Sequence, residues 1–239
     1  MKSTRILHTT TALAAGVLLM AGMAGCAQSP AGTSTSAPAP TSTSGSSPDA
    51  GGVEVAWLDE GRSFAVVTYG SSTCVPQMQS VSSDGQTVEV TLADADQEAA
   101  CTADFAPRAS LSVMPVEVDV TKDVEVKVVY GDLTDDAELD ALPAEPVGAT
   151  SMKPSAGWFD DSGIALLTWG SSTCPPVVSG VEQADAGATV TFGETDRVCT
   201  MDMAPRVTLI GLEQPVDDDL AFTLTLTGGN LSGTVDVLR

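Results

Sequence analysis

The stretch Trp57-Leu-Asp-Glu-Gly-Arg-Ser-Phe-Ala-Val-Val-Thr-Tyr-Gly-Ser-Ser-Thr-Cys74 occurs a second time as Trp158-Phe-Asp-Asp-Ser-Gly-Ile-Ala-Leu-Leu-Thr-Trp-Gly-Ser-Ser-Thr-Cys174. Each copy is followed by a second motif, Cys101-Thr-Ala-Asp-Phe-Ala-Pro-Arg108 or Cys199-Thr-Met-Asp-Met-Ala-Pro-Arg206. The offset between the copies is 100 residues at the first cysteine and 98 at the arginine. The order and the spacing agree, so the chain contains a duplicated unit.

Each copy has the pattern of short β-strands. Val-rich segments, which often alternate apolar with polar residues, are separated by turn signals such as Asp84-Gly85 and Gly228-Gly229. Trp57 and Trp158 are expected to begin core strands. The other expected strands are 63–69, 87–92, 109–113, 124–130, 164–169, 188–192, 207–212 and 220–226. The sequence predicts an all-β protein with two tandem small antiparallel β-sandwich or barrel-like domains, each with one internal disulfide, after a disordered tether.

The N-terminal residues have the layout of a secretory signal. Lys2 and Arg5 precede an apolar stretch over about residues 11–20, and small residues follow. The apolar stretch is shorter than the roughly 20 residues that span a bilayer. Residues 27–52 consist almost entirely of Ala, Gly, Ser, Thr and Pro. Such a segment has little to bury, so we expect a flexible tether with a reach of roughly 30 Å.

The end of the signal, Met23-Ala24-Gly25-Cys26, resembles a bacterial lipobox. The lipobox, the tether and the repeated Gly-Ser-Ser-Thr-Cys…Cys-Thr-x-Asp-x-Ala-Pro-Arg units together resemble small surface lipoproteins of high-GC Gram-positive bacteria. The resemblance implies a diacylglycerol on the Cys26 thiol, cleavage before it, and a location on the outer face of the bacterial cytoplasmic membrane. It implies no catalytic activity. The alternative is an ordinary secretory signal in which Cys26 only lies near the cut.

These features divide the chain into five parts. They are a signal peptide (1–25), the lipidated cysteine with its tether (26–52), a first β repeat (53–142), a linker (143–153) and a second β repeat (154–239). The linker is predicted from its prolines and glycine. The two repeats are called repeat 1 and repeat 2 below.

The chain has five cysteines. With Cys26 assigned to lipid, the duplication favours one bond inside each repeat, Cys74–Cys101 and Cys174–Cys199, over the other two pairings. Export makes oxidation plausible, and loops of this size give about 3–4 kcal/mol on the chain-entropy estimate. A redox-active pair would favour close spacing such as Cys-x-x-Cys, whereas these cysteines are 27 and 25 residues apart.

Charge and histidine content exclude several classes of function. The formal charge is −22, with 32 acidic and 10 basic residues, and so acidic a surface repels nucleic acid. The only histidine, His8, lies in the signal. Without it the mature chain cannot form a Ser-His-Asp or Cys-His catalytic site or a histidine-bearing zinc site. We therefore predict no catalytic residue, no metal ligand and no cofactor other than the covalent lipid.

The repeated polar residues are the candidate binding residues. Glycine followed by hydroxyl residues can expose backbone N–H groups as a small anion site, but the same residues also tighten turns. Arg108 and Arg206 either recognise a carboxylate or phosphate, or form internal ion pairs with Asp104 and Asp202. The candidates are Ser71, Ser72, Thr73 and Arg108 in repeat 1 and Ser171, Ser172, Thr173 and Arg206 in repeat 2.

Three functions remain open. The first is a non-enzymatic envelope lipoprotein that is held at the membrane by its lipid and presents two β-domains to an envelope protein, a glycan or a small ligand. The second is a hydrolase of cell-wall glycans that uses carboxylates. The third is a delivery lipoprotein for a solute or metal. A shared groove between the repeats would favour binding, and a deep pocket with facing carboxylates would favour the hydrolase.

Overall fold

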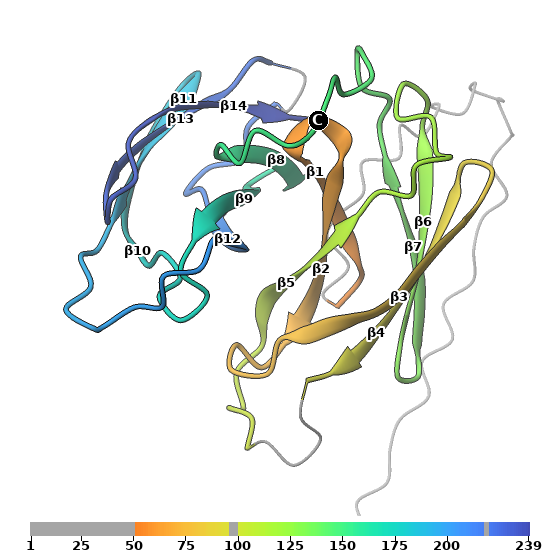
Figure 1. Cartoon of the computed structure of the whole chain (residues 1–239), viewed down its shortest axis with the longest axis horizontal. Helices are drawn as coiled ribbons and strands as arrows, with labels where there is room; N and C mark the ends of the chain where they lie inside the picture. The colour runs from red at the N-terminus through yellow and green to blue at the C-terminus, as the bar shows by residue number, and fades with distance from the viewer. Residues whose placement is uncertain (1–50, 96–99, 218–219) are drawn as a thin grey trace, which may run out of the picture. The chain divides into compact units, whose positions relative to one another are not determined.

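The described residues of the computed structural model, 51–95, 100–217 and 220–239, form two sets of seven β-strands (Figure 1). The signal peptide, Cys26 and nearly all of the tether lie outside the described residues. Among the described residues, no helix is long and apolar enough to cross a membrane. The strands of repeat 1 are β1 (Glu54–Leu58), β2 (Ser63–Gly70), β3 (Pro76–Asp84), β4 (Thr87–Asp94), β5 (Ala106–Val113), β6 (Val124–Tyr130) and β7 (Leu133–Leu139). Those of repeat 2 are β8 (Ser155–Asp160), β9 (Gly163–Gly170), β10 (Val178–Ala184), β11 (Gly187–Phe192), β12 (Ala204–Gly211), β13 (Thr223–Gly228) and β14 (Gly233–Leu238).

Both repeats have the same strand order. In repeat 1 a three-stranded sheet, β1-β2-β5, accompanies a four-stranded sheet, β3-β4-β6-β7. In repeat 2 the equivalent groups are β8-β9-β12 and β10-β11-β13-β14, which join into one sheet where β14 pairs with β8. The pairs β4–β6, β11–β13 and β14–β8 are parallel, and the other strand pairs of the described residues are antiparallel. The predicted all-β fold of two small domains is confirmed.

Each repeat buries its own core between its two groups of strands. Trp57, Phe64 and Val66 pack with residues of β4 and β6 in repeat 1, and Trp158, Ile164 and Leu166 occupy the same positions in repeat 2. The two tryptophans do not begin strands as expected. Each is the fourth residue of its strand, because three earlier residues also pair in the sheet.

A third core lies between the repeats. It contains Ala56, Leu58, Ala65 and Val67 from repeat 1 and Phe159, Ala165 and Leu167 from repeat 2. The strands β1, β2, β8 and β9 therefore bury apolar residues on both faces, one toward the repeat's own core and one toward the other repeat. This explains why 64–67 and 164–167 are continuous apolar runs rather than alternating ones, since strands buried on both faces lose the alternation.

The backbones of β1 and β8 approach closely in this contact. A β-carbon at position 157 would lie 2.1 Å from the carbonyl oxygen of Trp57, so only glycine fits there. Nearby, the Asp59 N–H donates to Ser155 Oγ at 2.8 Å. The duplicated units thus form one continuous packed structure across β1 and β8.

The linker is held against repeat 1. Arg62 Nη2 donates to the Val147 carbonyl at 2.7 Å, and Arg62 Nε donates to the Gly148 carbonyl at 3.1 Å. Leu142, just before the linker, is buried in the core of repeat 1. Residues 143–153 contain no strand, as their composition predicts.

Candidate functional site

Both predicted disulfides are present, and each joins two loops of its repeat. We call each pair of joined loops a corner, made of the Gly-Ser-Ser-Thr-Cys segment and the Cys-Thr-x-Asp-x-Ala-Pro-Arg segment of that repeat. The Cys74–Cys101 pair has a Cα–Cα distance of 5.5 Å, and the Cys174–Cys199 pair has one of 5.6 Å. The first cysteine of each pair follows the Gly-Ser-Ser-Thr segment, and the second begins the Cys-Thr-x-Asp segment. All eight candidate binding residues therefore lie at these two corners, four in each.

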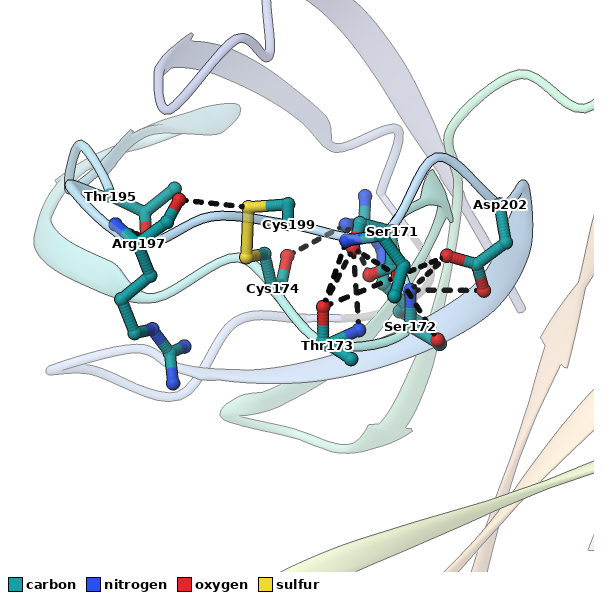
Figure 2. The surroundings of a disulfide bond; sticks show 10 residues. Ser171, Ser172, Thr173, Cys174, Thr195, Arg197, Cys199 and Asp202 are labelled. Carbon is teal, nitrogen blue, oxygen red and sulfur yellow. Dashed lines mark hydrogen bonds between the residues drawn. A yellow bond between two sulfur atoms is a disulfide. The ribbon is translucent and has the colours of Figure 1, made fainter.

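Hydrogen bonds inside each corner use the serines and threonines. The Ser72 N–H donates to Asp104 Oδ2 at 3.2 Å, and the Ser172 N–H donates to Asp202 Oδ1 at 3.1 Å. Figure 2 shows Asp202 turned toward Ser172 in this way, beside the disulfide. The N–H that an anion site would need is therefore already occupied by a carboxylate of the same corner.

The two aspartates are held in their ionised form. The hydroxyls of Thr102 and Thr200 donate to Asp104 and Asp202 respectively. The threonine hydrogen bonds make the largest contribution to the lowered pKa, and the contacts with Ser72 and Ser172 lower it further. The pKa of each carboxyl therefore falls from 3.8 to about 2. The aspartate of each corner is therefore held by donors of its own corner in both repeats.

The repeated arginines stabilise the same corners through backbone carbonyls. Arg108 Nη1 donates to the Cys74 carbonyl at 2.6 Å, and Arg206 Nη1 donates to the Cys174 carbonyl at 2.9 Å. The expected ion pairs with Asp104 and Asp202 are not formed within 4.0 Å among the described residues. The aspartates are turned toward the serine N–H groups instead, and this corrects the expectation.

The glycine of each motif makes room for the guanidinium. A β-carbon on Gly70 would lie 2.8 Å from Arg108 Cζ, and one on Gly170 would lie 2.7 Å from Arg206 Nη2. Each motif residue thus has a structural task, which favours the structural interpretation of the Gly-Ser-Ser-Thr segments over the binding one.

A cleft of about 820 Å³ lies between the repeats, and the sequence did not predict it. Its lining residues come from β1, β6 and β7 of repeat 1 and from β8 of repeat 2, with their neighbouring residues, together with Arg239. Acidic side chains dominate the lining: Glu54, Glu125, Asp135, Asp136, Glu138, Asp140, Asp160 and Asp161. Both repeats therefore build one strongly negative cleft.

Glu54 is the most perturbed carboxyl of this cleft. It shares the face of β1 that carries Ala56 and Leu58 toward repeat 2. Partial burial, and then the negative charges of Asp160 and Asp135, raise its pKa from 4.5 to about 7. One sequence signal could have identified it, because Glu54 is the only charged residue in the apolar segment 53–58.

The first and last strands of a repeat are arranged differently in the two repeats, and we call the boundary between these two strands the seam. In repeat 2 the edges of β14 and β8 pair, Val237 with Ala156 and Leu238 with Gly157. In repeat 1 the equivalent strands β7 and β1 belong to separate sheets. They are linked instead by the Val53 N–H to Asp135 Oδ2 at 3.0 Å and by Trp57 Nε1 to the Asp140 carbonyl at 2.7 Å. Repeat 1 therefore leaves its seam open where repeat 2 closes it.

Within residues 51–95, 100–217 and 220–239, no three His, Cys, Asp or Glu side chains are grouped closely enough to hold a metal ion. No protein-family model, curated protein or solved structure matches this chain. The corners and the cleft must therefore be interpreted from their own chemistry.

Proposed function

We propose that this protein is an exported, non-enzymatic lipoprotein, anchored by a lipid on Cys26 at the outer face of the bacterial cytoplasmic membrane. Its two β-domains bind a partner at the cell envelope, and the cleft between them is the binding site. The tether of residues 26–52 carries the domains away from the lipid head groups.

One observation carries the binding role. The cleft is lined by strands of both repeats, and its lining contains eight acidic residues against one basic residue, Arg239. One of the eight, Glu125, is paired with Lys127 at 3.4 Å, so the lining as a whole carries a large excess of acidic residues. The Ser, Thr, Asp and Arg residues of the repeated motifs, by contrast, bond to one another within the corners. A concave, polar surface between two domains is a common location of binding sites.

The anchor is tested with Cys26→Ser. The native protein should sediment with membranes and carry the mass of a diacylglycerol, and the variant should be released as a soluble protein. Equal retention of the variant in the membrane fraction would contradict the proposal. A matched Ser29→Ala variant in the tether keeps Cys26 and both disulfides and should stay in the membrane fraction.

A carboxylate-dependent hydrolase of cell-wall glycans is the second candidate, and Glu54 favours it. A carboxyl whose pKa is raised to about 7 by partial burial and by the neighbouring Asp160 and Asp135 has the property that a general acid needs. This candidate predicts release of reducing sugars from purified cell walls by the native protein and a loss of roughly a hundredfold or more in Glu54→Gln. Release of the same amount of reducing sugar by the native protein and by Glu54→Gln would exclude this candidate.

A further inference from the structure

We infer that the cleft receives an extended segment of a partner protein that carries lysine or arginine side chains, and that this segment adds its backbone to the open edges of β1 and β7. The inference rests on the proposed binding function and names the chemistry of its partner. Three features of the cleft support it: the excess of acidic residues in its lining, the missing pairing between β1 and β7, and a buried Trp158 Nε1 without a hydrogen-bond partner.

Charge selects a basic ligand. Eight carboxylates and one arginine line the cleft, so a cationic side chain that enters it gains attraction from several directions. The arrangement around Glu54 shows how concentrated this charge is, because Asp160 from β8 and Asp135 from β7 both act on a group of β1. A partner with lysines or arginines replaces this repulsion with attraction.

Strand pairing selects an extended backbone. Residues of β1 and β7 line the cleft, and the two strands do not pair with each other, whereas β8 and β14 pair at the equivalent place. Two hydrogen bonds link β1 and β7 at their ends, from the Val53 N–H and from Trp57 Nε1, and each strand pairs with a neighbour on one side only. Unpaired strand edges are templates for an added strand, whose backbone hydrogen bonds supply affinity while alternate side chains supply specificity. A segment with a basic residue at every second position would place all its charges on one side.

The cleft wall also has a buried donor that the protein leaves unsatisfied. Trp158 is part of the wall and is only 6 % exposed, and its Nε1 has no hydrogen-bond partner among the described residues. The equivalent Nε1 of Trp57 donates to the Asp140 carbonyl. Buried donors normally have a partner, so Trp158 Nε1 is a donor in the cleft wall that a bound segment could use.

Binding should release protons. The cationic segment stabilises the ionised form of Glu54, and Arg239 is the one basic group that faces the cleft beforehand. At pH 7 part of the Glu54 population is protonated, so neutralisation of Asp160 and Asp135 by the ligand lowers its pKa and frees a proton. Glu54→Gln should bind without this release.

The test uses the lipidated full chain in a neutral detergent and a synthetic ten-residue peptide of alternating lysine and valine. Calorimetry at low salt should show binding that weakens by about tenfold in Asp135→Asn/Asp160→Asn. The control variant Asp84→Asn/Glu89→Gln loses the same charge away from the cleft and should retain the affinity. The proton count comes from repeating the titration in buffers of different ionisation enthalpy.

Two control ligands separate the parts of the inference. A backbone-methylated version of the peptide cannot donate to the strand edges and should bind about tenfold more weakly. Spermine, a cation without a peptide backbone, should also bind more weakly than the peptide. Equal affinity of both double variants, or equal affinity of the methylated and unmethylated peptides, overturns the inference.

This outcome is distinguishable from failure of the proposed function. If the peptide does not bind while Cys26 still anchors the protein, the choice of ligand is wrong and the lipoprotein assignment stands. If the native protein cleaves cell-wall glycans and Glu54→Gln does not, the binding role itself is wrong.

Discussion

The corners of the two repeats have the same interior and different exteriors. Residues that bond within the corner match one for one, including Ser72 with Ser172, Asp104 with Asp202 and their donors. Several outward side chains differ. Val177, Val198 and Met201 of repeat 2 are exposed where repeat 1 has Gln77, Ala100 and Ala103, whereas Met203 and its counterpart Phe105 are both exposed apolar residues. Folding accounts for the shared hydrogen bonds, so the differences between the repeats are where we look for function.

The seams differ in the same informative way. Repeat 2 closes its β8–β14 seam, and repeat 1 leaves β1 and β7 open toward an acidic cleft. The duplication has kept the fold twice, but among the described residues the two equivalent strand pairs differ, because β8 and β14 pair and β1 and β7 do not. Five changes test this comparison.

Loss of either disulfide should have the largest effect on stability, and it should be the same in both repeats. The closed loops span 27 and 25 residues, so Cys74→Ser/Cys101→Ser and Cys174→Ser/Cys199→Ser should each cost about 3–4 kcal/mol. Urea denaturation of the oxidised native protein and of both variants measures this. A difference of more than a factor of two between the variants would show that the corners are not equivalent.

Gly157→Ala should be nearly as damaging and should act on the contact between the repeats. Its β-carbon would lie 2.1 Å from the Trp57 carbonyl oxygen, so β1 and β8 must separate, at a cost of about 3 kcal/mol. Gly180→Ala in β10 is the matched control, because nothing lies within 4 Å of its β-carbon position. If thermal denaturation gives both variants the same midpoint, the close approach of the repeats is wrong.

Glu54→Gln should stabilise the protein at pH 8. A raised acidic pKa means that the folded state binds the proton more tightly than the unfolded chain, so stability falls as the pH rises from about 4.5 to about 7 and then levels off. Removing the charge of this half-exposed group should recover about 1–2 kcal/mol above pH 7, with allowance for solvent screening. Denaturation at pH 4 and pH 8 should show the gain only at the higher pH.

Trp57→Phe should cost about 1 kcal/mol more than Trp158→Phe. Both changes remove similar apolar area, but only Trp57 loses a hydrogen bond and leaves the Asp140 carbonyl without its donor. Denaturant curves for the two variants give the difference directly. If both variants lose the same free energy of unfolding, the hydrogen bond from Trp57 to Asp140 does not stabilise repeat 1.

Asp104 and Asp202 should titrate together. Both carboxyls have a pKa near 2 for the same reason, a threonine hydroxyl and a serine N–H that donate to the ionised form. Carboxyl carbon shifts followed by NMR from pH 1 to pH 5 should place both midpoints well below 3.8. Thr102→Val and Thr200→Val should each raise only the midpoint of the aspartate in its own repeat.

Much of the fold could be predicted from the sequence, because duplication shows which features recur. The repeated cysteines gave the correct disulfides, and the Val-rich segments gave eight strands, among them β2 and β9. Strands β3, β7, β10 and β14 are missing from the sequence prediction, and β1 and β8 are predicted only from their tryptophans onward. Edge strands such as β3 and β7 escape prediction because they contain few apolar residues.

The cleft could not be predicted, for a physical reason. Its carboxylates come from β1, β6, β7 and β8, with their neighbouring residues, and no local pattern marks residues that only packing between repeats brings together. The continuous apolar run 64–67 did contain the necessary information. Its residues alternate between two cores, and a strand buried on both faces implies that a second layer covers it.

Native-state hydrogen exchange of β2 and β9 tests the central claim, that the two repeats are one packed structure with a shared cleft. The amides of Val66 and Leu166 lie at equivalent places in the two repeats, each within a doubly buried sheet. In increasing denaturant, both should show the same opening free energy and the same denaturant dependence, because both open only when the whole structure unfolds. If Val66 and Leu166 show different opening free energies, and the denaturant dependence is smaller in one repeat, the repeats unfold as independent domains. That result would contradict the account.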